Sequence, residues 1–338
     1  MTATNRLLLA AGIVLFAGTA WFNASATSFD PMIAPLKLLA GVLHLVVIGG
    51  AFRHLLHLER PKALAFAHDA LLGQVVCLAY VYLRSAVCNA TGAPGISSME
   101  VFGVEAALVG ATVYRTPGAL RLPDDALRKA LPALVVLVAW LGWLVAIAGQ
   151  KLDLLYTPSS DPDIHAYYVK AFLERGHIYY DLLPDSDAWM VYPSGFATLN
   201  FIFGRLSGLH PVQLVNIAPY LQLTLFAGAG FSALASTATR RLAVPLAVLH
   251  FGVAYLVFNA VFGEHRMFLE GTPRLAHTAL LFFPLFFVLQ HHRRLTLGSK
   301  PWSLPFASVA VSCCINPTHA PAALLVGFVA LLVFSLLR

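Results

Sequence analysis

Residues 193–206 read PSGFATLNFIFGRL, and this stretch decides how the chain is threaded through a membrane. The apolar run within it, from Phe196 to Leu206, has about 11 residues and contains Arg205. A helix that crosses a bilayer needs about 20 apolar residues, so this run predicts a short helix at the membrane surface. Its apolar side is expected to carry Phe196, Leu199 and Phe203, and its other side Asn200.

The remainder of the chain has the composition of a membrane protein. Hydrophobic residues make up 59% of it and charged residues 11%, and the mean hydropathy is +0.75. Soluble domains carry about 25% charged residues, so the composition excludes water-soluble folds and predicts an all-α, polytopic helical membrane protein. The net charge of +6 lies in short basic clusters between apolar runs, as in cytoplasmic loops, and does not indicate a nucleic-acid partner.

Apolar runs of spanning length predict about ten transmembrane helices in two modules. Residues 1–149 form an N-terminal five-helix membrane module, and residues 212–338 form a C-terminal one. Between them, residues 150–211 form an extracytoplasmic loop with short juxtamembrane helices. The expected spans are residues 7–22, 33–52, 63–83, 99–114, 131–149, 212–236, 242–262, 275–290, 304–315 and 321–337.

The basic clusters set the expected orientation. If the run from Phe196 to Leu206 lies on the surface, Arg240, Arg241 and the basic residues 291–294 all fall in the cytoplasm. If it crosses the membrane, they all fall outside, against the positive-inside rule. The first arrangement is therefore preferred. It makes the loops 84–98, 150–211 and 263–274 extracytoplasmic.

The long loop contains a predicted helix with carboxylates at its start. Asp161 is a favoured N-cap residue, the Pro that follows it suits the first helical position, and Gly176 suits the position after the end. The helix is predicted over residues 162–175, with His165 and Tyr168 on one face.

Asp161 and Asp163 lie at the positive end of the helix dipole, which keeps them ionised. Ionised carboxylates can act as a general base or hold a divalent cation such as Mg²⁺ or Mn²⁺. The same two residues are also ordinary helix-start chemistry, and His165 is equally consistent with a surface histidine. The sequence leaves these alternatives open.

Several motifs resemble the GT-C glycosyltransferases. DPDIH at 161–165, FLERG at 172–176 and YPSGFATL at 192–199 resemble the first outer loop of that superfamily, and NPTHA at 316–320 resembles a later short loop of its bacterial members. The resemblance covers about residues 161–337. It implies a multi-span enzyme that takes a sugar from a polyprenyl-phosphate donor on the outer side of the membrane. Five spans precede the acidic loop here, where the family usually has one.

The resemblance implies roles for individual residues. Asp161 or Asp163 would be the base of an inverting transfer or would hold the cation, and His165 would support the same headgroup. Arg266 or Arg274 would pair with the donor phosphate, since guanidinium suits phosphate oxygens; the alternative is that they anchor the chain to lipid headgroups. The further expected substrate-binding residues are Tyr168, Tyr192, Glu264, Glu270 and His319.

The implied acceptor is a lipid, a glycan or a protein outside the cytoplasm, and the implied location is a bacterial inner membrane. A second hypothesis is a transporter or flippase of a lipid-linked sugar, and a third is a non-catalytic subunit of an envelope glycan assembly. Transporters often place charges at mid-membrane, whereas the predicted spans are nearly free of charge, which argues against transport. His68 and Asp69, near the inner end of the third span, are expected to reach back to water.

Overall fold

A computed structural model describes residues 31–59, 61, 64–115, 135–146, 160–178, 195–237, 278–293, 295–296, 300–315 and 320–337. Within these ranges the regular structure is helical and contains no strand, which confirms the predicted all-α class. An unlabelled helix covers Val135–Ala146. The labelled elements are α2 (Ala34–Leu55), α3 (Ala65–Thr91), α4 (Ser98–Arg115), α6 (Ser160–Arg175), α7 (Gly195–Ser207), α8 (Pro211–Thr237), α11 (Thr278–His291), η2 (Lys300–Trp302), α12 (Ser303–Ile315) and α13 (Ala320–Leu337).

Four of the described helices are long and apolar enough to cross a membrane. They are Ala34–Leu55, Ala65–Thr91, Pro211–Ser236 and Ala320–Leu337, and each matches a predicted span. Shorter apolar helices lie at Val135–Ala146, Ala279–His291 and Ser303–Cys313, again where spans were predicted. At the predicted span 99–114 the structure has a helix, α4, which is not among those apolar enough to cross a membrane. The predicted spans at residues 7–22 and 242–262 lie outside the described residues, so the count of ten stays a prediction.

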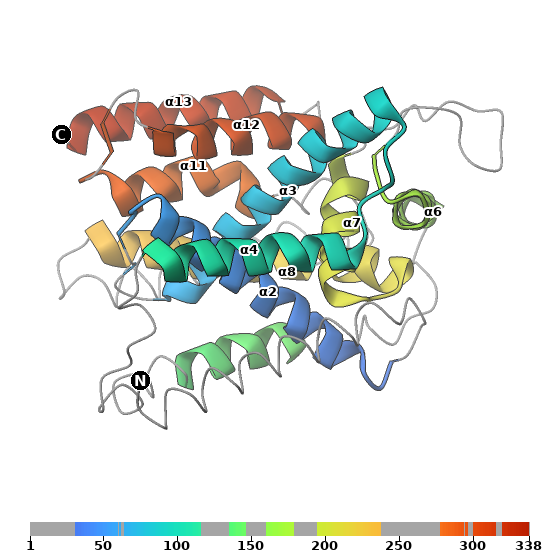
Figure 1. Ribbon diagram of the computed structural model, residues 1–338. Helices are drawn as coiled ribbons and strands as arrows, with labels where there is room; N and C mark the ends of the chain where they lie inside the picture. Colours follow the sequence, from blue (N-terminus) through green and yellow to red (C-terminus); the bar gives the residue numbers. More distant parts are fainter. Residues whose placement is uncertain are drawn as a thin grey trace.

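The described spans lie side by side as a bundle (Figure 1). Its closest pair is α2 and α3, which approach at glycines. A Cβ atom on Gly49 would collide with the backbone oxygen of Asp69, and one on Gly73 would collide with that of Leu45. Small residues at such crossings let two membrane helices pack backbone against backbone, and α2 and α3 pack in this way.

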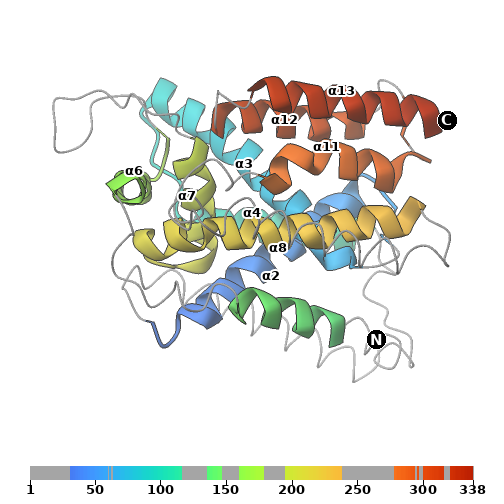
Figure 2. The same cartoon turned by 180° about the vertical axis from the view of Figure 1, so that it is seen from behind.

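Two helices run across the bundle at one end. In Figure 1, α6 is seen end-on and α7 stands upright, while α8 and α13 run roughly horizontally and α2 and α3 run obliquely, and the view from behind in Figure 2 agrees. We call this end, where α2, α4 and α8 begin and α3 finishes, the α6 end. At the opposite end, Arg53 of α2 meets Asp69 of α3, and His68 meets His291 of α11. This grouping agrees with the orientation expected from the basic clusters, which places residues 84–98 and 150–211 on one side of the membrane and residues 291–294 on the other.

The helix α7 is short, as predicted, but it has no polar face. All its residues except Arg205 are buried, including Asn200. The expected exposed side is wrong because α2, α3, α4, α6, α8 and α12 all pack around α7.

The helix α3 is longer than predicted. It continues through Arg84 to Thr91 and ends at Gly92, which has a positive φ of 67°. The prediction that residues 84–91 form a loop is wrong because Ser85, Arg84 and Asn89 stay helical and use their polar side chains to bind neighbouring segments.

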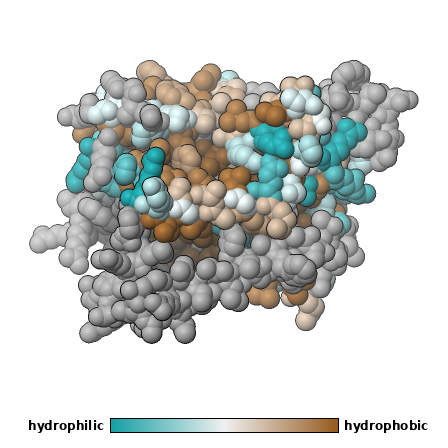
Figure 3. Space-filling view, in the orientation of Figure 1, coloured by the Kyte–Doolittle hydropathy of each residue, from teal (hydrophilic) through white to brown (hydrophobic). Residues whose placement is uncertain are grey.

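The surface of the bundle has a hydrophobic band between two more hydrophilic regions. In Figure 3, hydrophobic residues occupy the middle of the visible bundle and hydrophilic residues gather toward its two sides, one of them the α6 end. Exposed apolar side chains include Val135 and Val138 of the unlabelled helix and Leu324 and Phe328 of α13. A band of this kind is what a bilayer requires, and the chain is a helical membrane protein.

Candidate functional site

The helix α6 is amphipathic and lies on α7. Its buried side carries His165, Tyr168, Val169 and Phe172, at the spacing of one helix face. Asp163 lies on the exposed side. The apolar spacing therefore folds residues 160–175 as a surface helix whose charged side faces outward.

His165 anchors the first half of α6 rather than pointing outward. Its side chain is buried and its ring meets the ring of Phe196 edge-on, with the centroids 4.9 Å apart. Tyr168 lies next to it, at a centroid distance of 6.4 Å. The reading of His165 as a surface histidine is wrong, because the first turn of α7 covers it.

The second half of α6 is held by hydrogen bonds to its last residues. The backbone N–H of Ile96 donates to the carbonyl of Gly176 at 2.5 Å, and Asn89 Nδ2 donates to the carbonyl of Ile178 at 2.9 Å. The backbone N–H of Ile178 donates to Ser85 Oγ at 3.0 Å. From the other side, Arg205 Nη2 donates to the carbonyl of Leu173 at 2.6 Å. We call this set of contacts the α6 clamp.

Glycine makes the α6 clamp feasible. Gly176 ends α6, as predicted, with a positive φ of 77°, a conformation that glycine adopts without strain. A Cβ atom on Gly176 would lie 2.9 Å from the backbone of Gly95, and a Cβ atom on Gly95 would collide with the carbonyl oxygen of Arg175. The end of α6 and the connection between α3 and α4 are therefore in direct backbone contact.

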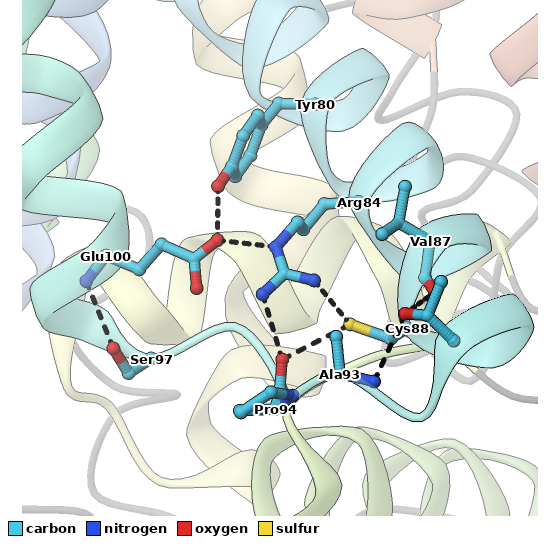
Figure 4. A network of polar contacts seen from close by, with 9 residues as sticks. Tyr80, Arg84, Val87, Cys88, Ala93, Pro94, Ser97 and Glu100 are labelled. Atoms are coloured by element: carbon cyan, nitrogen blue, oxygen red, sulfur yellow. Dashed lines mark hydrogen bonds and ion pairs between the residues drawn. The ribbon is translucent and has the colours of Figure 1, made fainter.

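A polar network supports this connection (Figure 4). Arg84 Nε donates to Glu100 Oε1 at 2.8 Å and Arg84 Nη2 donates to the carbonyl of Pro94 at 2.9 Å, while Tyr80 O–H donates to the same carboxylate oxygen at 2.5 Å. The hydroxyl of Ser97 accepts from the backbone N–H of Glu100 at 3.0 Å. The Ser-x-x-Glu spacing is a helix-start signature that the sequence already contained, although the network itself was missed.

Of the two predicted carboxylates, the structure describes the side chain of Asp163 and only the backbone at position 161. Asp163 lies on the exposed side of α6, about 18 Å along the helix from Arg175 at 1.5 Å per residue. Position 161 is inside α6 rather than at its N-cap, because the helix begins at Ser160. Helix positions two apart do not face each other, so the backbone does not favour a single ion bound by both carboxylates. The remaining predicted residues, Tyr192, Glu264, Arg266, Glu270, Arg274 and His319, lie outside the described residues.

Cations gather near the α7–α8 connection at this end. Lys37 is buried and its Nζ donates to the carbonyl of Gly208 at 3.0 Å. Burial, with Lys170 and Lys37 nearby, lowers the pKa of His210 below its usual 6.5. Burial also lowers the pKa of Arg205. Among the described residues no group of three or more His, Cys, Asp or Glu side chains has metal-site geometry.

The spans contain buried ionisable groups that the sequence reading did not expect. His44 Nδ1 lies 2.8 Å from Glu105 Oε2, and both side chains are buried. Asp69 accepts from Arg53 Nε at 2.8 Å and from Nη2 at 3.2 Å. The expectation that Asp69 reaches water is wrong because α2 brings Arg53 onto it.

The same holds for His68, which was also expected to reach water. It is buried, its Nδ1 lies 3.5 Å from Asp69, and its Nε2 lies 3.3 Å from Nε2 of His291. The packing of α11 against α3 closes it off from solvent. The predicted spans are thus less free of charge than their sequence suggested.

The interior also holds a very small pocket that is lined mainly by apolar side chains and contains three amides. It lies between α3, α7 and α8. Gln222 Nε2 donates to Gln74 Oε1 at 3.0 Å across it, and Asn200 lines the same space. The pocket lies inside the bundle, so it is separate from the exposed face of α6.

Comparisons of the chain with models of protein families, with curated proteins and with solved structures give no match.

Proposed function

We propose that the chain is an integral-membrane glycosyltransferase of the GT-C type, acting at the α6 end. The observation that supports this most is the placement of α6. A charged helix lies across one end of a membrane bundle, clamped at its last turn, with Asp163 on its exposed side. The motifs DPDIH and FLERG, which resemble the outer loop of that superfamily, form this helix.

The proposed reaction is an inverting sugar transfer. A carboxylate at position 161 or 163 takes the proton of an acceptor hydroxyl. The hydroxyl oxygen then bonds to the anomeric carbon of the donor sugar, and the bond from that carbon to the phosphate oxygen breaks. Polyprenyl phosphate leaves with the electron pair. Arg266 or Arg274 is proposed to neutralise that phosphate, and no step is assigned to a metal ion.

The α6 clamp gives this proposal its physical basis. A catalytic carboxylate must be held within about half an ångström of its productive position, and the clamp fixes the helix that carries Asp163. Buried His165 and Phe196 fix the first half of the same helix. Their expected role is to position the carboxylates, since His165 is covered by α7.

The test is transfer from radiolabelled polyprenyl-phosphate sugars by the purified protein. Asp161→Asn and Asp163→Asn keep the side-chain shape, and the variant that removes the base should lose about 10²–10⁴-fold in rate. Glu174→Gln is the matched control, because Glu174 is an exposed carboxylate on the same helix, 3.8 Å from Lys170. Full activity in both Asn variants would leave sugar transfer without its base. Activity lost in chelator and restored by Mn²⁺ or Mg²⁺ would give the carboxylates a metal-binding role instead.

The second candidate is a transporter or flippase of a lipid-linked sugar. The buried pairs His44–Glu105 and Arg53–Asp69 favour it, because ionisable groups inside a membrane commonly mark transport paths. In liposomes the two functions separate cleanly. A flippase would move labelled lipid-linked sugar between leaflets without forming a new product, whereas a glycosyltransferase would form one.

A further inference from the structure

His44 of α2 and Glu105 of α4 form a hydrogen-bonded pair near the middle of their helices. His44 lies 10 residues after Ala34 and 11 before Leu55, the ends of α2. Glu105 lies 7 residues after Ser98 and 10 before Arg115, the ends of α4. At 1.5 Å per residue, His44 is about 15 Å from either end of its helix. Because half the hydrocarbon thickness of a bilayer is about 15 Å, the pair lies near the mid-depth of the membrane.

The pair is closed off from water. The side chains of His44 and Glu105 are 5% and 0% exposed, and the ring of Phe102 packs on His44 with centroids 4.8 Å apart. Glu105 Oε2 is 2.8 Å from His44 Nδ1, whereas Glu105 Oε1 has no hydrogen-bond partner among the described residues. One carboxyl oxygen therefore has an imidazole partner, and the other has no donor in the part of the chain that the structure describes.

Among the described residues, few other charged or titratable groups lie near the pair. From α3 the nearby group is the buried thiol of Cys77. On α7, the charged residue is Arg205, whose guanidinium is used at Leu173. On α4 itself, Glu100 is held by Arg84 near the α6 end. The protonation of Glu105 is thus decided by His44 and by burial.

A neutral imidazole that donates from Nδ1 to a carboxylate would leave a net negative charge buried, which is the costliest case. Two arrangements of the shared proton leave the pair without net charge. In the first, an imidazolium donates to a carboxylate, and Oε1 then carries part of a negative charge with no donor beside it. In the second, a carboxylic acid donates from Oε2 to Nδ1 of a neutral imidazole, and Oε1 is an uncharged carbonyl oxygen. Buried charges are costly unless every charged atom is paired. The unpaired Oε1 therefore favours the second arrangement.

We propose that His44 and Glu105 form a proton-binding site at the mid-depth of the membrane, with the proton on Glu105 Oε2 and shared with His44 Nδ1. The ligand is a proton, and the two helices α2 and α4 hold it between them. Buried carboxyl and histidine groups at this depth are those through which membrane proteins couple proton movement to changes in shape. The site goes beyond sugar transfer, which is assigned to the α6 end.

Infrared spectroscopy of the purified protein at neutral pH tests the proposal directly. The difference between wild type and Glu105→Gln should contain the C=O stretching band of one protonated carboxylic acid. Glu100→Gln is the matched control on the same helix, because Arg84 holds Glu100 as a carboxylate. Its difference spectrum should contain carboxylate bands alone. A Glu105→Gln difference with carboxylate bands and no acid band would overturn the proposal.

A second measurement covers the case in which Glu105→Gln does not fold. In ¹⁵N-histidine NMR, imidazole and imidazolium nitrogens resonate at different positions. The signals that disappear in His44→Gln should belong to a neutral imidazole protonated on Nε2, because Nδ1 accepts from Glu105. Loss of an imidazolium signal instead would mean an ion pair and would refute the neutral acid. Both readouts are independent of any enzymatic or transport activity.

Discussion

Substituting Gly176 by alanine should weaken the α6 clamp by a predictable amount, and Gly92 provides the control. Both glycines end a helix with positive φ, 77° at Gly176 and 67° at Gly92. An alanine in this conformation costs about 1–2 kcal/mol. At Gly92 a Cβ atom meets nothing within 4 Å, whereas at Gly176 it lies 2.9 Å from the backbone of Gly95 and Ile96.

The two variants should therefore differ by the cost of overpacking alone. Forcing backbone apart costs about 1–3 kcal/mol, so Gly92→Ala should lose about 1–2 kcal/mol and Gly176→Ala about 2–5 kcal/mol of unfolding free energy. Unfolding of the purified protein in denaturing detergent measures both. Limited proteolysis near Arg175 measures release of α6, which should be faster in Gly176→Ala alone. Equal losses in the two variants would show that the Gly95–Gly176 contact does not hold α6.

Three other perturbations have expected outcomes. Asp69→Ala leaves Arg53 buried without its carboxylate and should cost about 3–5 kcal/mol in detergent unfolding. Arg84→Gln, at a solvent-accessible pair, should cost clearly less, and equal losses would contradict the difference in burial. His165→Phe should retain fold and sugar transfer if the imidazole only packs on Phe196, and a rate loss at unchanged thermal stability would assign it a chemical role. Because the folded state lowers the pKa of His210, its neutral form stabilises the fold above pH 6.5, and this stability should be lost as the pH falls below 6.5; thermal melts should show this loss in wild type and less of it in His210→Gln.

The sequence was sufficient for the helices whose signal is local. Apolar length located α2, α8 and α13, and Gly176 marked the end of α6. The length of α3 was missed because Arg84 and Asn89 look like loop residues until their partners at Pro94 and Ile178 are known. Hydropathy averages over a window and does not register a polar side chain that finds its partner on another helix.

In the candidate site, too, the features encoded by adjacent residues could be predicted and the contacts between distant segments could not. Residues 161–176 could be recognised as a helix with carboxylates at its start, since caps and spacing are written in adjacent residues. The clamp could not be predicted, because Ser85, Ile96 and Arg205 reach α6 from three separate segments. Likewise, the burial of His165 depends on Phe196, whose contact with it is set by the packing of α7 rather than by spacing along α6.

The buried Lys37 has a consequence for how the chain is inserted. Its acceptor, the carbonyl of Gly208, lies 171 residues later. At about 5–20 residues per second of synthesis, roughly 10–30 s pass between the emergence of the two. Lys37 lies in the first turn of α2, so its ammonium group can stay at the membrane surface until that acceptor is made. This hydrogen bond can therefore form only after the α7–α8 connection has been made, so the final position of the first turn of α2 depends on a segment synthesised much later.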